Sequence, residues 1–488
     1  MPVEQTPLKT HQPGAGYQTL WRWHFYAGLF VMPLLVVLAI TGTLYCFKPQ
    51  LEPLLYPQLM VVQPQATSRL DADALLAATR HAMAAASTAV SMQVSNDAER
   101  SAEFVFRMPD GQQRSVYVNP YDGTVLGTLS VADRFMQVTR MLHRKLMLGK
   151  PGELLMELAA CWTLVMIATG VAMWWPRARE GKLAAFKPRL SLKGRPFWKS
   201  LHAAMGIWLA AGAIAFVLTG LPWTGSWGRN FQSLAASVNL GAPPGAWGNL
   251  PLRSGLPDAQ AEQSGNAPSP AMQHHHGDDA PPEVVMDQLP IPLVPWAVGN
   301  LTVPNSTETA SSSTPIPIQQ VINQVAALGV HSNYTLALPG SREGVYTVSY
   351  FPPDPKQERT IYIDQYSGSV MRDIRYTDYG AISQAVSYGT SLHMGRYFGL
   401  ANQIVSALIA VGLGAMAVTG AIMWWKRRPA HSLGAPSRQP SAPPMRGWKL
   451  GLILLGAVFP LMGVTLLMVW AADWLMFQRT LRPLHLAK

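Results

Sequence analysis

Five apolar segments dominate the pattern of hydrophobic and polar positions along this chain of 488 residues. Each contains roughly 20 mainly apolar residues, the length that a helix needs to cross the hydrocarbon core of a bilayer. The expected spans cover residues 25–47, 153–175, 203–223, 399–425 and 449–471. We therefore predict a mainly α membrane protein that is built around a helical transmembrane bundle.

Two long polar segments, 48–141 and 224–391, show the alternation of apolar and polar residues that is typical of antiparallel strands. In each, a helix-like run precedes strand-like stretches that are bounded by Asp-Gly or Ser-Gly turns. The motif Tyr-x3-Tyr-x-Gly-x-Val occurs in both, beginning at Tyr117 and at Tyr362. We predict two small α+β modules on the same side of the membrane.

The second polar segment carries an insert, 225–314, that has no counterpart in the first. Because the insert is rich in Pro, Gly, Ser and Ala and shows little periodicity, we expect much of it to be flexible. It contains His274, His275 and His276, which together with nearby carboxylates could bind a transition metal. Adventitious metal affinity is the favoured interpretation of this cluster, since the first polar segment lacks it.

Basic residues gather directly after the second and the fourth span, and their position sets the expected topology. Residues 176–200 hold many Lys and Arg but a single Glu, and residues 426–448 hold Lys and Arg with no acid. By the positive-inside rule both loops face the cytoplasm, so the N-terminus lies inside and the C-terminus in the periplasm. The net charge of +11 therefore reflects membrane topology rather than binding to nucleic acid.

These observations give a domain prediction for the whole chain as a multi-pass membrane protein, with the outer side taken as the periplasm of a Gram-negative cell. It comprises a cytoplasmic N-terminus (1–24), span 1 (25–47), periplasmic module 1 (48–141), a His-bearing segment with span 2 (142–175), a basic cytoplasmic loop (176–200), span 3 (201–223), periplasmic module 2 (224–391) with the insert 225–314, a His-bearing segment with span 4 (392–425), a second basic cytoplasmic loop (426–448), span 5 (449–471) and a periplasmic tail (472–488).

The cysteine content limits the redox cofactors that the chain can hold. There are only two cysteines, Cys46 and Cys161, and no C-x-x-C or C-x-x-C-H motif occurs. Iron–sulfur clusters and covalently attached haem are therefore excluded by the sequence pattern.

Two histidine motifs occur twice each. His143 and His393 are each followed by Gly after six residues and by Thr-Gly after 26 residues. His24 and His202 are each followed by Gly after four residues and by Thr-Gly after 17 residues. This repetition without gaps predicts a tandem duplication, in which each half contributes one helix of each type.

The four histidines suggest haem ligation, because a polar side chain at a membrane span is costly and usually functional. The predicted topology places His24 and His202 at the cytoplasmic ends of their spans, and His143 and His393 at the periplasmic face. A pseudo-twofold axis along the membrane normal would bring the members of each pair face to face. Two opposed imidazoles are what a six-coordinate b-type haem needs, so we predict two haem b per chain.

Smaller residues in the same motifs have their own interpretations. Gly28 and Gly206 lie one helical turn after a histidine and would leave room for a porphyrin. The Thr-Gly pairs are interpreted as helix-packing positions, since small residues let helices approach closely. Basic residues beside the histidines could meet haem propionates: Arg22, Arg144, Lys199 and Arg396.

Four stretches carry a resemblance to a known family: WRWHFYAGL, LHRKLMLG with TGVAMWWPR, WKSLHAAMGIW with TGLPWTGSWG, and LHMGRYFG with TGAIMWWKRR. The chain resembles the PepSY-associated transmembrane family of iron-regulated bacterial inner-membrane proteins. The resemblance implies PepSY-like periplasmic modules and a haem-dependent reductase of ferric siderophores that serves iron acquisition. It also implies the haem-ligand role for His24, His143, His202 and His393.

The sequence contains neither a G-x-G-x-x-G fingerprint nor a P-loop. We therefore expect the electrons to come from quinol or from a separate cytoplasmic reductase, with ferric siderophore and membrane lipids as the other partners. Two further function classes stay open at this point. One is a metal or siderophore transporter, and the other is a PepSY-type regulatory binding protein without redox activity, which leaves the four histidines unexplained.

Overall fold

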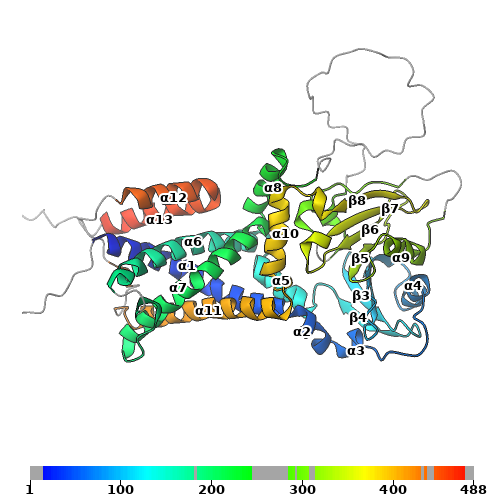
Figure 1. The fold of residues 1–488 in the computed structure, drawn as a ribbon, viewed down its shortest axis with the longest axis horizontal. Helices are drawn as coiled ribbons and strands as arrows, with labels where there is room; N and C mark the ends of the chain where they lie inside the picture. The colour runs from blue at the N-terminus through cyan, green and yellow to red at the C-terminus, as the bar shows by residue number, and fades with distance from the viewer. Residues whose placement is uncertain are drawn as a thin grey trace, which may run out of the picture.

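The computed structural model describes residues 15–180, 184–243, 284–291, 294–306, 314–429, 434–436 and 445–478. The described part of the chain has two regions, a bundle of long helices and a domain built on a β-sheet (Figure 1). Short helices join the two regions.

Among the described residues, four helices are long and apolar enough to cross a membrane: α1 (Ala15–Cys46), α6 (Gly149–Glu180), α7 (Gly194–Gly220) and α11 (Leu400–Trp425). Helix α1 packs against α6 and α11, and α7 packs against the same two neighbours. Helices α1 and α7 therefore occupy opposite corners of the bundle. Apolar side chains such as Val31, Val165 and Val217 fill its interior.

The predicted fifth span differs from the structure. Residues 449–471 are divided between α12 (Arg446–Val458) and α13 (Pro460–Gln478), which pack side by side (Figure 1). Pro460 lacks the N–H that a continuous helix needs at this point. The turn is tight, because a Cβ on Gly456 would lie 3.1 Å from Gly463 Cα.

This hairpin has a consequence for the expected topology. Figure 1 shows the end of α13 at the same end of the bundle as the start of α1. Of the predicted periplasmic tail, 472–488, residues 479–488 lie outside the described residues, and its side of the membrane stays a prediction. Hydrophobicity alone could not separate a straight span from a hairpin of similar composition.

One antiparallel sheet combines both predicted modules, in the strand order β4-β3-β2-β1-β5-β6-β7-β8. The join is the antiparallel pairing of β1 with β5, in which Met92 lies opposite Leu336. The order is symmetric about this pair, and a register shift occurs at Tyr117/Val118 in one half and at Tyr362/Ile363 in the other. The strands are β1 (Thr88–Val94), β2 (Ala102–Arg107), β3 (Gln113–Val118), β4 (Val125–Ser130), β5 (Tyr334–Ala337), β6 (Val345–Tyr350), β7 (Arg359–Asp364) and β8 (Val370–Arg375).

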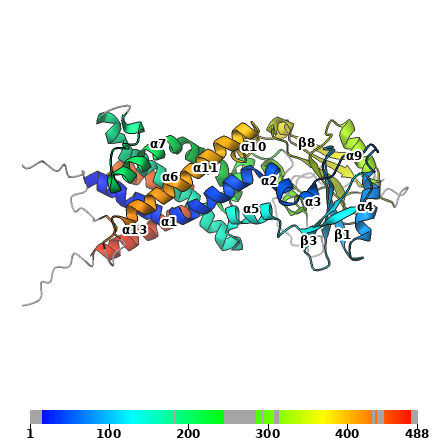
Figure 2. The ribbon, with the colours of Figure 1, turned by 90° about the horizontal axis from the view of Figure 1, so that it is seen from below.

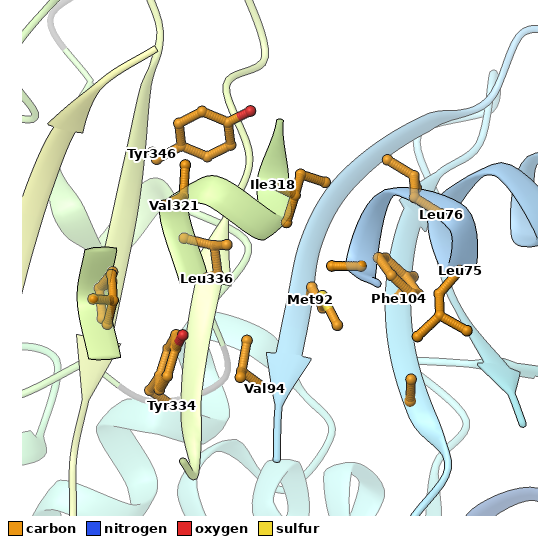
Figure 3. Packing of buried hydrophobic residues seen from close by; sticks show 14 of the residues in the cluster. Leu75, Leu76, Met92, Val94, Phe104, Ile318, Val321, Tyr334, Leu336 and Tyr346 are labelled. Carbon is orange, nitrogen blue, oxygen red and sulfur yellow. The ribbon is translucent and has the colours of Figure 1, made fainter. Parts of the chain in front are cut away.

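Helices α4 (Ala72–His81) and α9 (Ile318–Ala327) cover one face of this sheet with a single shared core. Figure 3 shows side chains of this core from both halves, with Met92 and Ile318 between Phe104 on one side and Leu336 on the other. The two helices also meet directly, because Asp73 accepts hydrogen bonds from the first backbone N–H groups of α9. The two polar segments therefore fold as one domain.

The structure describes three parts of the insert, 225–243, 284–291 and 294–306. They form α8 (Trp227–Ser237) and the short 3₁₀ turns η3 (Met286–Gln288) and η4 (Trp296–Val298). Residues such as Met286 and Val298 are fully buried against the second half of the sheet. The two 3₁₀ turns are too short to show a helical or strand period, so the sequence pattern did not reveal η3 and η4. His274, His275 and His276 lie outside the described residues.

Short helices turn the chain between the sheet and the bundle. Helix α5 (Phe135–Lys145) precedes α6, and α10 (Ala381–His393) precedes α11 (Figure 2). Helices α2 (Lys48–Leu55) and α3 (Pro57–Met60) lead from α1 into the sheet domain. After α5 the backbone turns through the left-handed conformations of Leu146 and Met147, and after α10 through those of Gly395 and Gly399.

Candidate functional site

The first pair of predicted ligands lies inside the bundle. His24 on α1 and His202 on α7 face each other from opposite corners, with ring centroids 6.3 Å apart and ring planes at 90°. They come from different halves of the chain, 178 residues apart by subtraction of their numbers (202 − 24).

The second pair lies where the bundle meets the sheet domain. His143, near the end of α5, and His393, at the end of α10, have ring centroids 6.5 Å apart and ring planes at 80°. Phe216 of α7 packs against His393 with a centroid distance of 5.1 Å. The structure thus brings together the same partners that the duplicated motifs pair.

Each histidine ring is held by a threonine of a Thr-Gly motif. The Nδ1–Oγ1 distances are 2.9 Å for His24–Thr169, 2.9 Å for His143–Thr41, 2.8 Å for His202–Thr419 and 2.8 Å for His393–Thr219. Each threonine hydroxyl donates its own proton to a carbonyl three or four residues earlier in its helix, as Thr41 does to Val37 at 2.6 Å. The hydroxyl therefore accepts from Nδ1–H. This fixes the neutral tautomer in which Nε2 has a free lone pair.

The glycine after each threonine leaves room for the same ring. A Cβ on Gly42 would lie 3.4 Å from His143 Cε1, and one on Gly170 would lie 3.4 Å from His24 Cε1. Gly220 and Gly420 stand in the same relation to His393 and His202, at 3.4 and 3.7 Å. A side chain larger than alanine at these positions would displace the imidazole.

These contacts correct the interpretation of the Thr-Gly pairs as helix-packing positions. They orient the four histidines, and sequence reasoning missed this role. The signal was present in the fixed spacing, because every histidine motif carries its own Thr-Gly pair after 17 or 26 residues. Each pair, however, serves a histidine of a different motif, which spacing along one helix does not reveal.

Helices α1 and α7 each contribute to both sites. Helix α1 carries His24 at one end and Thr41, the partner of His143, at the other. The 17 residues between His24 and Thr41 correspond to about 25 Å along the axis, most of the thickness of a bilayer core. Helix α7 repeats this with His202 and Thr219. The two histidine pairs therefore lie at opposite ends of the same two helices.

The ring separation fits a metal that is ligated by both imidazoles. An imidazole nitrogen binds a first-row metal at about 2.0 Å and lies about 1.2 Å from its ring centroid, so two opposed imidazoles on one metal place their centroids about 6.4 Å apart. Both observed separations, 6.3 and 6.5 Å, agree with this value.

The donor set distinguishes haem from a bare ion. Within the described part of the chain, no group of three or more His, Cys, Asp and Glu side chains is placed to hold a metal ion. Two imidazoles fall short of the four protein ligands of a usual structural zinc site, and they match the axial ligand set of a six-coordinate haem, in which a porphyrin supplies four further nitrogens. The residues present therefore fit haem.

The comparison with protein families assigns the chain to a family. The family described as PepSY-associated TM region matches residues 21–427, which include both histidine pairs and all four Thr-Gly motifs. The chain belongs to this family. No curated protein matches it.

The remaining predicted site residues of this PepSY-associated membrane protein have mixed surroundings. No described atom lies within 4 Å of a Cβ placed on Gly28, whereas a Cβ on Gly206 would lie 3.1 Å from Met416 Cε. Arg144 donates to the carbonyl of Trp223 at 3.1 Å, and the guanidinium of Arg396 donates to the carbonyl of Phe351. Arg144 directly follows His143 and Arg396 follows His393 by three residues, and their contact with propionates stays a prediction.

On the other side, Arg22 donates to the Tyr26 hydroxyl at 3.3 Å, and the Lys199 ammonium lies 5.9 Å from the ring centroid of Tyr17. Both belong to the end of the bundle that holds His24 and His202. Their role toward propionates likewise stays a prediction.

Proposed function

We propose that this protein is a b-type di-haem oxidoreductase of the bacterial inner membrane, built by tandem duplication about a pseudo-twofold axis. In this proposal it passes electrons across the membrane and reduces ferric siderophore in the periplasm, for iron acquisition. The observation that carries the proposal is the pairing of four histidines at 6.3 and 6.5 Å, each with Nε2 free for a metal.

In this proposal His24 and His202 hold the cytoplasmic-side haem, and His143 and His393 hold the periplasmic-side haem. Haem b, when bound, supplies one-electron transfer. The chain contributes the ligands, their orientation through threonine, and apolar surroundings that exclude water. Because α1 and α7 reach both sites, the same two helices fix the separation of the two redox centres.

The substrate assignment comes from the family resemblance. Fe(III) in the siderophore gains one electron and is released as the more weakly held Fe(II). The donor in the proposal is quinol or a separate cytoplasmic reductase. In the proposal the sheet domain holds the PepSY-like modules and receives the periplasmic substrate. Helices α5 and α10, which carry His143 and His393, lie at the end of the bundle that faces this domain (Figure 2).

A transporter is less well supported by the acidic groups of the bundle. Glu153 forms an ion pair with Lys145 at 3.6 Å, and Glu157 accepts the backbone N–H groups of Ser226 and Trp227 at the start of α8. Both carboxylates are therefore engaged in holding local structure, rather than free to bind a passing cation.

Two measurements on protein purified from haem-replete cells test the proposal. A pyridine haemochrome assay should give two non-covalent haems per chain. Colourless protein would refute the proposed haem-dependent electron transfer. After reduction with dithionite and removal of the excess, ferric siderophore and a ferrous-iron trap are added. Haem reoxidation should equal trapped Fe(II) in electron count. If several ferric siderophores fail but a cupric complex or a quinone reoxidises the haems, the substrate is wrong and the conduit stands.

A further inference from the structure

Glu358 is a buried carboxyl group for which the proposed function has no use. It connects the 3₁₀ turn η5 (Pro355–Gln357) to β7, and 1% of the residue is exposed. Ser387 on α10 donates a hydrogen bond to Glu358 Oε2 at 2.9 Å. The other oxygen, Oε1, has no hydrogen-bond partner within the described part of the chain. A buried carboxylate oxygen without a donor is costly, so this atom requires an explanation.

The surroundings of Glu358 are polar but incompletely paired. The Tyr379 hydroxyl, which interacts electrostatically with Glu358, is also buried and has no hydrogen-bond partner among the described residues. The titratable and charged groups that interact with Glu358 are Tyr376 and Tyr379, which follow β8, and Arg396, which follows α10. The Arg396 guanidinium also donates to the Phe351 carbonyl and lies over the Phe351 ring at 4.3 Å, so only part of its charge is available to Glu358.

This environment favours the neutral form of the carboxyl group. Burial raises the pKa of Glu358 to about 8, although the Ser387 hydrogen bond and the charge of Arg396 oppose the shift. A proton on Oε1 would turn the unpaired acceptor into a donor and remove the buried negative charge. The geometry and the pKa thus point in the same direction.

Helix α10 links this carboxyl group to the outer pair. Ser387, which contacts Glu358, and His393 lie on the same helix, six residues or about 9 Å of rise apart. Arg396 follows His393 by three residues. At such distances in a partly buried region, one unit of charge affects the protonation of its neighbour.

We propose that Glu358 is a proton-binding site coupled to reduction of the outer haem site. This inference rests on the proposed function. The electron comes from the donor on the cytoplasmic side, and the proton comes from periplasmic water and forms an O–H bond at Glu358. When the electron leaves to the ferric substrate, that O–H bond breaks and the proton returns to water. Near and above about pH 8, where the oxidised protein holds Glu358 at least partly ionised, this uptake offsets the charge of the transferred electron.

The first half of the chain supplies the substitution that tests this. Glu358 precedes Tyr362 by four residues, and the corresponding position before Tyr117 is Gln113. Glu358→Gln therefore installs the residue of the other half, keeps the side-chain shape and removes the titratable group. Glu343→Gln, at an exposed carboxyl group of the same domain, is the matched control.

The measurement is a spectroelectrochemical titration of the haem-loaded protein at pH 6 to 9. In the parent protein and in Glu343→Gln, the midpoint potential of the outer site should be constant at low pH and fall as pH rises through about 8. In Glu358→Gln it should be independent of pH over this range. Equal pH dependence in all three proteins overturns the inference. A haem content below two per chain would instead count against the proposed function.

A second variant and a second readout keep the test decisive if Glu358→Gln fails to fold. Ser387→Ala keeps the carboxyl group but removes its hydrogen-bond donor, so the pH window should move upward. An unchanged window contradicts the inference.

Infrared difference spectra between oxidised and reduced protein at pH 8 should show a gain of protonated carboxyl C=O signal on reduction. Absence of that signal from the parent protein would also contradict it.

Discussion

Thr41 and His143 are 102 residues apart in the chain, and the Thr41 hydroxyl oxygen lies 2.9 Å from His143 Nδ1. The helix that carries Thr41 begins its membrane crossing near His24, whose ring is in turn held by Thr169 of α6. Each histidine is thus oriented by a helix other than its own. Assembly of the helices and orientation of the ligands are therefore one event, and a misplaced helix would disturb a site to which it contributes no ligand.

Thr41→Val tests this orientation at the outer site. The substitution nearly preserves shape but removes the acceptor of His143 Nδ1–H, so the ring loses its fixed tautomer and part of its basicity. We expect the affinity of the outer site for haem to fall roughly 10- to 100-fold. The midpoint potential of the outer site should rise, since a less basic ligand stabilises Fe(III) less. Haem titration and potentiometry would measure both effects.

Thr43→Val is the matched control for this experiment. Thr43 lies two residues further along α1, and its hydroxyl donates to the Ala39 carbonyl at 2.7 Å within the helix. This variant should retain the affinity and potential of the parent protein, and Thr41→Ser should recover most of both. If Thr43→Val reproduces the effects of Thr41→Val, they arise from general loss of a membrane hydroxyl, and the orienting role is refuted.

Single histidine variants should fall into two spectral classes. His24→Ala and His202→Ala should lose the same component and leave about one haem per chain, because an iron with one remaining imidazole binds weakly. His143→Ala and His393→Ala should lose the other component. Optical spectra and haemochrome analysis of the four variants measure this. A shared class for His24 and His143 would show that the pairs exchange partners when haem binds.

The sequence was sufficient to predict the four long helices and the pairing partners, since both depend on patterns that repeat along the chain. It was not sufficient for the contact of Thr219 with His393. That contact joins a span to a short helix 174 residues away, and threonine at such a position also suits close helix packing. The pairing of β1 with β5 was likewise hidden, because alternation identifies a strand but not which strand lies beside it.

Stability of the protein should depend on the protonation of Glu358. Its pKa is raised to about 8 by burial, so the folded state binds this proton more tightly than the unfolded state does. The stabilisation is fully present below the unfolded pKa and is lost as pH rises through the folded pKa. The free energy of unfolding should therefore fall between about pH 5 and pH 8, by an amount on the order of 5 kcal/mol.

Denaturant unfolding of the sheet domain within the full chain, followed at several pH values, measures this slope. Glu358→Gln should flatten it, and Glu343→Gln should not. A slope that survives in Glu358→Gln would assign the pH dependence to other groups.

The hairpin of α12 and α13 makes a prediction about topology. Trp162 of α6 donates to Thr465 Oγ1 at 3.0 Å, and Trp227 donates to the Val458 carbonyl at 2.8 Å, so the hairpin is attached to the bundle near its turn as well as along its length. Because the chain reverses at Pro460, residues after Gln478 should lie on the same side as the basic loop that precedes α12. By the positive-inside rule that side is the cytoplasm.

Fluorescent protein fused after Gln478 should fluoresce, and alkaline phosphatase fused there should be inactive. Phosphatase inserted at the Gly111 turn of the sheet domain should be active and serves as the control. An active phosphatase after Gln478 would mean that this segment crosses the bilayer and that the hairpin does not form in the membrane.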